Sequence, residues 1–193
     1  MLISKFDNTN IGKEIEDFEH KYSFEFPDMY KEFLLKYNGG ETPKSEFKIN
    51  KISSDIRAFY GLGNADKYYH YDTLVKINMF NDWLEEQVIP IATNVFGDYI
   101  MIGIGSENNG KIFFCYHDRP NKPIELTKNF KEFLERCKSK KIGHIQTVEE
   151  RMQKLIKNGN EKNITPALIK IWEDQINEYA NMHQEELILD KVE

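Results

Sequence analysis

The pair His117-Asp118, which follows the apolar run KIFFCY, is the clearest candidate for catalysis in the sequence. A histidine beside a carboxylate can act as a general base with an orienting partner. Such a pair also needs a nucleophile, and the chain contains no G-x-S-x-G nucleophile elbow. We therefore favour a solvated strand end at this position. An enzyme whose site is assembled from scattered residues, such as His117, Asp118 and Asp98, stays open as an alternative.

Two glycine-rich segments, GLGNAD and GIGSENNG, begin like phosphate-binding loops. Neither completes G-x-G-x-x-G or ends in Gly-Lys-Ser/Thr, so both are better interpreted as turns. Pairs of adjacent glutamates also fail as acid-base pairs, because neighbouring residues diverge on a helix. These pairs are Glu85-Glu86, Glu149-Glu150 and Glu185-Glu186. We expect their carboxylates to face solvent.

Cys115 and Cys137 are the only cysteines in the chain. The first lies in an apolar, strand-like run, and the second falls on the apolar face of an expected helix. Both fit small buried side chains better than a disulfide or a nucleophile. The five histidines show no metal-ligand spacing, and two cysteines cannot complete a zinc site without them. The sequence predicts no metal, no cofactor and no catalytic residue set.

The net charge of the chain bears on the kind of molecule that it can bind. The formal net charge is -6, and the isoelectric point is about 5.5. Direct nucleic-acid binding is disfavoured, because phosphate recognition uses a dense lysine and arginine surface. An acidic chain fits a basic protein partner, although acidity also serves solubility alone.

The hydropathy of the chain bears on its location. No apolar run approaches the roughly 20 residues that span a bilayer. The opening MLISKFDNTN lacks the basic segment and long apolar stretch of a secretory signal. We therefore expect a cytoplasmic protein without membrane contact. A chain of 193 residues suits one domain, or one domain with an appendage.

The N-terminal part has the spacing of two amphipathic helices. NIGKEIEDFEHKY repeats large apolar residues at helical spacing. The stretch FPDMYKEFLLKYNGG predicts a second helix with a broad aromatic face. Pro27 suits its first turn, where the missing N–H has no partner. Gly39 and Gly40 can end the helix in a left-handed conformation.

Strand-like patterns follow these helices. EFKINKI alternates Phe47, Ile49 and Lys51 against polar neighbours, and DIRAFYGLG gives a second short run. Tyr68 to Glu86 favours helix in its second half. VIPIATN, DYIMIGIG and GKIFFCYHD are β-rich runs, and SENNG joins the last two with a loop of hairpin length. LTKNFKEFLERCK is a closing helix with Thr127 as its expected N-cap. This segregation of helices and strands favours an α+β fold.

The composition changes after Lys138, where TVEERMQKLIK carries a capping box of Thr147 and Glu150. Thr165-Pro166 then gives a cap and an N1 proline to a longer helix. We predict a domain of residues 1–140 and a C-terminal helical extension, residues 141–193, that contains a helical hairpin. Either the hairpin packs on the domain, or Trp172 and Tyr179 form part of a homodimer or partner surface.

Several segments in order resemble the SUKH superfamily, whose founding member is a fungal regulator of cell-wall synthesis. The resemblance covers about residues 8 to 138. It rests on the ordered set Pro27, the aromatic helix, Asn38-Gly39-Gly40, Tyr60-Gly61, Pro90-Ile91-Ala92 and Gly97-Asp98. It implies a curved, mainly antiparallel sheet braced by N-terminal helices and a closing helix. In bacteria it implies, above all, immunity proteins that neutralise polymorphic or contact-dependent toxins.

Most of these signature positions have a structural explanation in the sequence. Gly39, Gly40 and Gly97 suit special backbone geometry, and Pro27 starts a helix. Asp98 is the polar member without a packing role, so it either stabilises a turn or contacts a partner. Asp98, Trp172 and Tyr179 are the predicted partner-binding residues.

Three hypotheses follow. The first is a non-enzymatic immunity protein that binds and blocks a cognate toxin, for example a nuclease with a basic substrate channel. The second is a regulatory scaffold, by analogy with the fungal member of the family. The third is the enzyme with scattered site residues described above. Of these, we favour the immunity protein.

Overall fold

The computed structural model describes residues 1–119 and 122–189. Two compact units divide the chain. The first comprises Met1–Lys140 together with the segment that begins at Glu185, and the second comprises Lys141–Gln184. The assignment of residues 141–193 to one extension stays a prediction.

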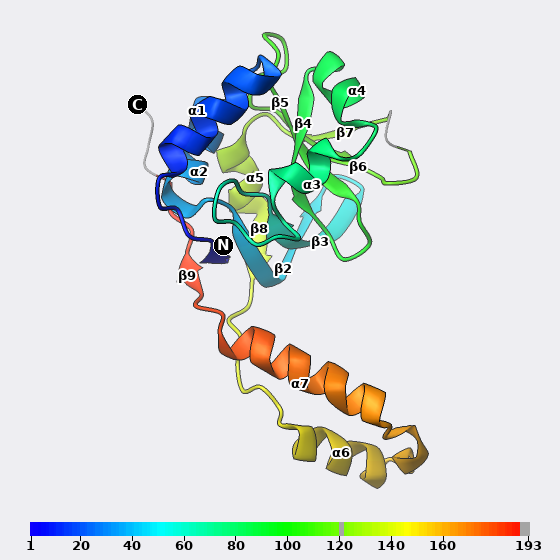
Figure 1. Cartoon of the computed structure of the whole chain (residues 1–193). Helices are drawn as coiled ribbons and strands as arrows, with labels where there is room; N and C mark the ends of the chain where they lie inside the picture. Colours follow the sequence, from blue (N-terminus) through cyan, green and yellow to red (C-terminus); the bar gives the residue numbers. More distant parts are fainter. Residues whose placement is uncertain (120–121, 190–193) are drawn as a thin grey trace. The chain divides into compact units, whose positions relative to one another are not determined.

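In the described part of the chain, nine strands form one open sheet in the order β7-β6-β5-β4-β3-β2-β1-β9, and β8 pairs with β2 (Figure 1). All the strand pairings are antiparallel. The strands are β1 Leu2–Lys5, β2 Gly40–Ile49, β3 Ile52–Phe59, β4 Val88–Thr93, β5 Tyr99–Gly103, β6 Ile112–Cys115, β7 Ile124–Thr127, β8 Cys137–Ser139 and β9 Glu185–Glu186.

The antiparallel open sheet with its accompanying helices confirms the predicted α+β class, although helices also fall between the strands. The first unit holds α1 Ile11–Tyr22, α2 Asp28–Tyr37, α3 Tyr71–Val75, α4 Phe80–Glu85 and α5 Phe130–Arg136. The second unit holds α6 Val148–Lys157, the 3₁₀ turn η1 Glu161–Asn163 and α7 Pro166–Ala180. No helix in the described residues combines the length and the apolarity that crossing a membrane requires.

Aromatic packing holds the helices of the first unit on the sheet. The Phe130 ring of α5 packs edge-on against Phe33 of α2 and Phe59 of β3, with centroids 5.3 Å and 5.9 Å away. Tyr71 of α3 packs against Phe18 of α1 at 5.1 Å. These side chains are buried, and burying rings of this size is a large stabilising term.

The helix punctuation around α2 differs slightly from the sequence prediction. Pro27 is the N-cap, with φ -54°, and the helix itself begins one residue later at Asp28. Asn38, with φ 51°, takes the left-handed conformation first, ahead of Gly39 and Gly40. Asparagine tolerates this conformation better than most residues, which is why it can end the helix here.

Three other expectations were wrong at element boundaries. Lys51 lies in the turn between β2 and β3, because those strands pair as far as Ile49 and Ile52. Thr127 belongs to β7, and Asn129 caps α5 by accepting a hydrogen bond from the Glu132 N–H at 2.8 Å. Cys137 lies in β8, opposite Phe47 of β2.

The burial predicted for both cysteines is confirmed. Burial raises the pKa of the Cys115 thiol to about 11 and that of the Cys137 thiol to about 12. Both thiols therefore stay protonated near neutral pH, where the thiolate would be the reactive form.

The second unit is the helical hairpin that its caps predict, with α6 and α7 side by side (Figure 1). Thr147 and Glu150 form the capping box, and Thr165 caps α7 with Pro166 at its start. Trp172 and Tyr179 are partly buried. The Arg151 guanidinium lies 5.9 Å from the centre of the Trp172 ring, a cation–π contact within the hairpin. A partner role for Trp172 and Tyr179 stays a prediction.

Candidate functional site

The loop between β4 and β5 is held by the side chain of Asn94. Its Oδ1 atom accepts hydrogen bonds from the backbone N–H groups of Phe96 at 2.9 Å and Asp98 at 2.8 Å. Its Nδ2 atom donates to Ser54 Oγ and to Asp98 Oδ2, both at 3.0 Å. The buried Asn94 side chain thus hydrogen-bonds to backbone N–H groups within the loop and at its end, and it ties the loop to β3.

Asp98 anchors the same loop to the end of β6. Its Oδ1 atom accepts a hydrogen bond from the His117 backbone N–H at 3.0 Å and lies 2.7 Å from His117 Nδ1. Burial acts to raise the pKa of Asp98, but the hydrogen bonds from His117 and Asn94 outweigh it and hold the pKa below its ordinary value. Asp98 is therefore a buried carboxylate that stays ionised near neutral pH. Whether it also contacts a partner stays a prediction.

The tip of the loop carries two apolar side chains into solvent. Val95 is 57% exposed and Phe96 is 74% exposed. The Val95 N–H donates to Asp55 Oδ2 at 3.1 Å, and Gly97 turns the chain with φ 83°. The loop therefore exposes two apolar side chains while its backbone N–H groups are hydrogen-bonded to the side chains of Asp55 and Asn94.

A hollow of about 420 Å³ lies beside this loop, and we call it the β4–β5 hollow. Its lining includes the carboxyl groups of Glu46, Asp55 and Asp98 and the rings of Phe96, Phe114 and Tyr116. Lysine and arginine are absent from the described residues that line it. The hollow therefore combines negative charge with aromatic surface.

The pair of His117 with Asp118, which the sequence analysis weighed and disfavoured, does not form. His117 Nδ1 pairs with Asp98, whereas Asp118 lies 3.8 Å from the Arg119 guanidinium in an exposed ion pair. The pairing follows from the sheet, because Tyr99 of β5 lies opposite Cys115 of β6 and brings the two strand ends together. An ionised Asp98 holds the Nδ1–H of the ring toward itself. This contact positions the imidazole and secures the loop.

The remaining signature residues lie elsewhere and serve backbone geometry. Asn38 is fully buried, donates to the carbonyl oxygens of Asp7 and Leu62, and accepts from the Leu62 N–H. A Cβ on Gly39 would lie 2.6 Å from the carbonyl oxygen of Tyr60. Pro90 lies at a register shift of β4, where a missing N–H is tolerated. These residues stabilise the fold around α2 and β4.

The chain's own atoms occupy the space at the glycine-rich turns. A Cβ on Gly103 would lie 2.0 Å from the carbonyl oxygen of Asn108, and one on Gly105 would lie 2.0 Å from Gln87 Oε1. These glycines allow close packing of a turn, which agrees with the interpretation of GIGSENNG as a turn.

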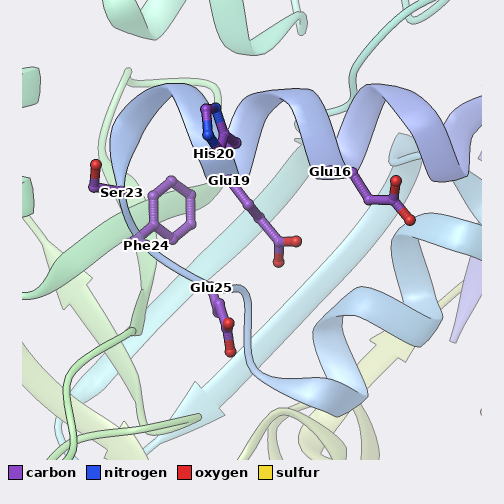
Figure 2. A pocket seen from close by; sticks show the side chains of 6 residues that line it. All are labelled: Glu16, Glu19, His20, Ser23, Phe24 and Glu25. Carbon is purple, nitrogen blue, oxygen red and sulfur yellow. The ribbon is translucent and has the colours of Figure 1, made fainter.

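A second hollow, of about 500 Å³, lies at the end of α1 (Figure 2). Figure 2 shows Glu16 and Glu19 on one side of the helix and Glu25 on the segment that follows. Glu19 accepts hydrogen bonds from the Phe26 N–H at 2.8 Å and from Lys31 Nζ at 2.6 Å. Through these two bonds, the Glu19 side chain ties α1 to the start of α2. In the described part of the chain, no three His, Cys, Asp or Glu side chains are grouped to hold a metal ion.

The sequence prediction found Asp98 but missed Asn94, Asp55 and Phe96. Asparagine followed three residues later by Gly-Asp is a turn signal, because an asparagine side chain bonds readily to nearby backbone N–H groups. That signal could have located the Asn94 network. Asp55 joins the network through strand pairing, which is not visible locally.

The fold and the ordered signature residues define an α+β domain of the SUKH type. The chain belongs to the SMI1/KNR4 family (SUKH-1), whose model matches residues 12–136. The family is known for toxin-immunity proteins. A similar relative is the SPbeta prophage-derived protein YokK of Bacillus subtilis (strain 168). It is 28% identical over 153 residues, which cover 67% of this chain and 76% of YokK.

Proposed function

We propose that this protein is an immunity protein that binds a cognate bacterial toxin domain and neutralises it in a stoichiometric complex. Family membership supports the class of function. The protein acts in the cytoplasm, makes or breaks no covalent bond in its partner, and needs no cofactor. A regulatory scaffold of the same fold is the alternative.

The observation that carries the proposal is the loop that presents Val95 and Phe96. An exposed aromatic side chain is the type of residue that contributes most to protein–protein affinity. Hydrogen bonds accepted by the side chains of Asn94, Asp98 and Asp55 fix the loop before any partner arrives. A preorganised loop loses less conformational entropy on binding than a flexible one, so more of the contact energy appears as affinity.

The net charge supports a basic partner such as a nuclease domain. Nucleases bind phosphate through lysine and arginine side chains, and an acidic inhibitor competes for that surface. The net charge of -6 also attracts a basic toxin during diffusional encounter, which raises the association rate. Association should accordingly slow as salt is added.

The test uses a toxin domain encoded by a gene next to this one, where the genome carries such a gene. Cells that express this domain should survive when the immunity chain is co-expressed, and the two purified proteins should elute together. A matched variant with a disrupted core, Phe33→Asp, should abolish both effects. The proposal fails if the two intact proteins show no binding at micromolar concentration. Recovery of several unrelated partners by the purified chain would favour the scaffold instead.

A further inference from the structure

We propose that the β4–β5 hollow is a docking site for an arginine side chain on a protein partner, with Val95 and Phe96 making the adjoining apolar contact. This inference rests on the proposed function, since it assigns the surface and the chemistry through which the protein binds. Three features of the hollow carry it.

The first feature is a pair of like charges. Glu46 of β2 and Asp55 of β3 are direct register partners, so their side chains emerge on the same face of the sheet. Like charges directly opposite one another in an antiparallel pair are destabilising. Lys138 of β8 lies opposite Glu46 on its other side, and it lines a neighbouring hollow with Lys44, Lys140 and the same two carboxylates. Within residues 1–119 and 122–189, however, Glu46 forms no ion pair with any of these lysines. A cation placed between the two carboxylates would relieve their repulsion.

The second feature is the aromatic surface in the same hollow. Phe96 is 74% exposed and Tyr116 is 37% exposed, and the Tyr116 ring packs edge-on against Phe114 at 4.9 Å. A guanidinium group is planar and stacks on aromatic faces, while its fork of N–H donors matches a carboxylate. Arginine meets both properties of the lining. A lysine ammonium offers a point charge and a weaker match to the rings.

The third feature is the size and rigidity of the site. A hollow of about 420 Å³ falls within the range of small-ligand pockets, about 300–1,000 Å³. One of its walls is the loop that Asn94 and Asp98 hold in place. Anionic ligands such as nucleic acid are disfavoured, because the carboxylates of the lining repel phosphate. The carboxylates that line this hollow therefore favour a cationic group over an anionic one.

The experiment titrates the full-length protein with short peptides and follows backbone amide chemical shifts by NMR. The probes are acetyl-Gly-Arg-Gly-amide, its lysine analogue, and its citrulline analogue, which keeps the shape of arginine without the charge. We expect saturable shifts at Asp55, Phe96 and Tyr116 with the arginine peptide. Binding should be weaker with lysine and absent with citrulline.

Two pairs of variants locate the site. Glu46→Gln should weaken arginine-peptide binding about fivefold, as expected for loss of one exposed charge pair. Glu107→Gln, the same change on an exposed loop residue outside the hollow, should leave it unchanged. Phe96→Ala should weaken binding about threefold through loss of the stacked ring. Tyr68→Ala is its control, because Tyr68 is similarly exposed at 70% and lies outside the hollow.

Shifts that do not saturate, equal binding of the citrulline or lysine peptide, or unchanged binding in Glu46→Gln and Phe96→Ala would each overturn the docking site. The titration contains no toxin. Its failure therefore leaves the immunity function standing with a different surface, and failure of toxin binding leaves a confirmed arginine site in need of another partner.

Discussion

The carboxylate of Asp98 is a central hydrogen-bond acceptor beside the β4–β5 loop. It accepts hydrogen bonds from the backbone and ring of His117 and from the side chain of Asn94. A buried acceptor with several donors is costly to alter, because the donors lose their partner as well. Asp98 thereby links the end of β6 to the loop that displays Phe96.

Asp98→Asn should lower the free energy of unfolding by about 1–3 kcal/mol at neutral pH. The folded-state pKa of Asp98 lies below its ordinary value of 3.8. Its charge therefore contributes stability that is present above that value and is lost as the pH falls through the folded-state pKa. The gap between wild type and Asp98→Asn should shrink in urea unfolding at about pH 3. Asp118→Asn is the control, with an effect within about 0.5 kcal/mol. A gap of equal size at both pH values would contradict the assignment.

Buried tyrosine hydroxyl groups make the folded state less stable at alkaline pH. The hydroxyl groups of Tyr30 and Tyr71 share a hydrogen bond at 3.0 Å, and both side chains are fully buried. Burial raises the pKa of Tyr30, Tyr60 and Tyr71 well above its ordinary value. The stability linked to these groups is present below about pH 10 and is lost as the pH rises.

Tyr71→Phe should make the loss of stability above about pH 10 less steep, since one fewer phenol ionises on unfolding. The slope of the unfolding free energy against pH should be shallower by about 1.4 kcal/mol per pH unit. Urea unfolding at several alkaline pH values measures that slope. An unchanged slope would show that Tyr71 ionises in the folded state.

At the scale of elements, glycines mark where the backbone leaves no room for a side chain. A Cβ on Gly40, where φ is 141°, would lie 2.5 Å from the carbonyl oxygen of Ser4 in β1. At Gly97 φ is 83°, but nothing lies within 4 Å of a Cβ built there. Gly143 has neither a crowded neighbour nor a positive φ. Alanine substitutions at these three positions therefore compare steric overlap plus backbone strain, backbone strain alone, and neither effect.

We expect Gly40→Ala to be the most destabilising of the three alanine substitutions, on the order of 3–4 kcal/mol, because it combines strain with a clash between β1 and β2. Gly97→Ala should cost about 1–2 kcal/mol from strain alone. Gly143→Ala should change stability by less than about 0.5 kcal/mol. Thermal and urea unfolding rank the variants. If Gly97→Ala proves as costly as Gly40→Ala, the clash is not the dominant effect.

The elements that could be predicted from the sequence are those with a local signal. The spacing of Ile11, Ile15 and Phe18 predicted α1, and the Thr147-Glu150 box predicted the start of α6. Strands β1, β7, β8 and β9 were missed, because they are two to four residues long and their identity comes from distant partners. β8, for example, exists because Cys137 pairs with Phe47. No local pattern reports such a pairing.

Only part of the candidate site was predictable from the sequence, namely the part with a local signal. Asp98 stood out as a polar residue without a packing role, and Asn94 lies close enough in sequence to have been found. The contact between Asp98 and His117 depends on the register of β5 against β6. The hollow depends on β2 and β3 lying beside the β4–β5 loop. Both arise from the assembled sheet.

At the scale of the whole molecule, the features support the proposal of a protein that binds without turnover. The signature residues Asn38, Gly40 and Pro90 build the sheet and its bracing helices. The sheet positions Asn94 and Asp98, which fix the exposed loop. The net negative charge then favours a basic partner. The signature residues, the sheet, the loop and the net charge all support the proposal that the protein acts by covering another protein's surface.

The most direct test of this claim is a titration of a cognate toxin domain's own activity with increasing amounts of the protein. A stoichiometric inhibitor should reduce the activity linearly, with an end point near one molecule per toxin molecule, and the activity should return when the complex is dissociated. Lasting inactivation of many toxin molecules by one immunity chain would show turnover. That result, or undiminished toxin activity at an equal molar ratio, would contradict the proposed function.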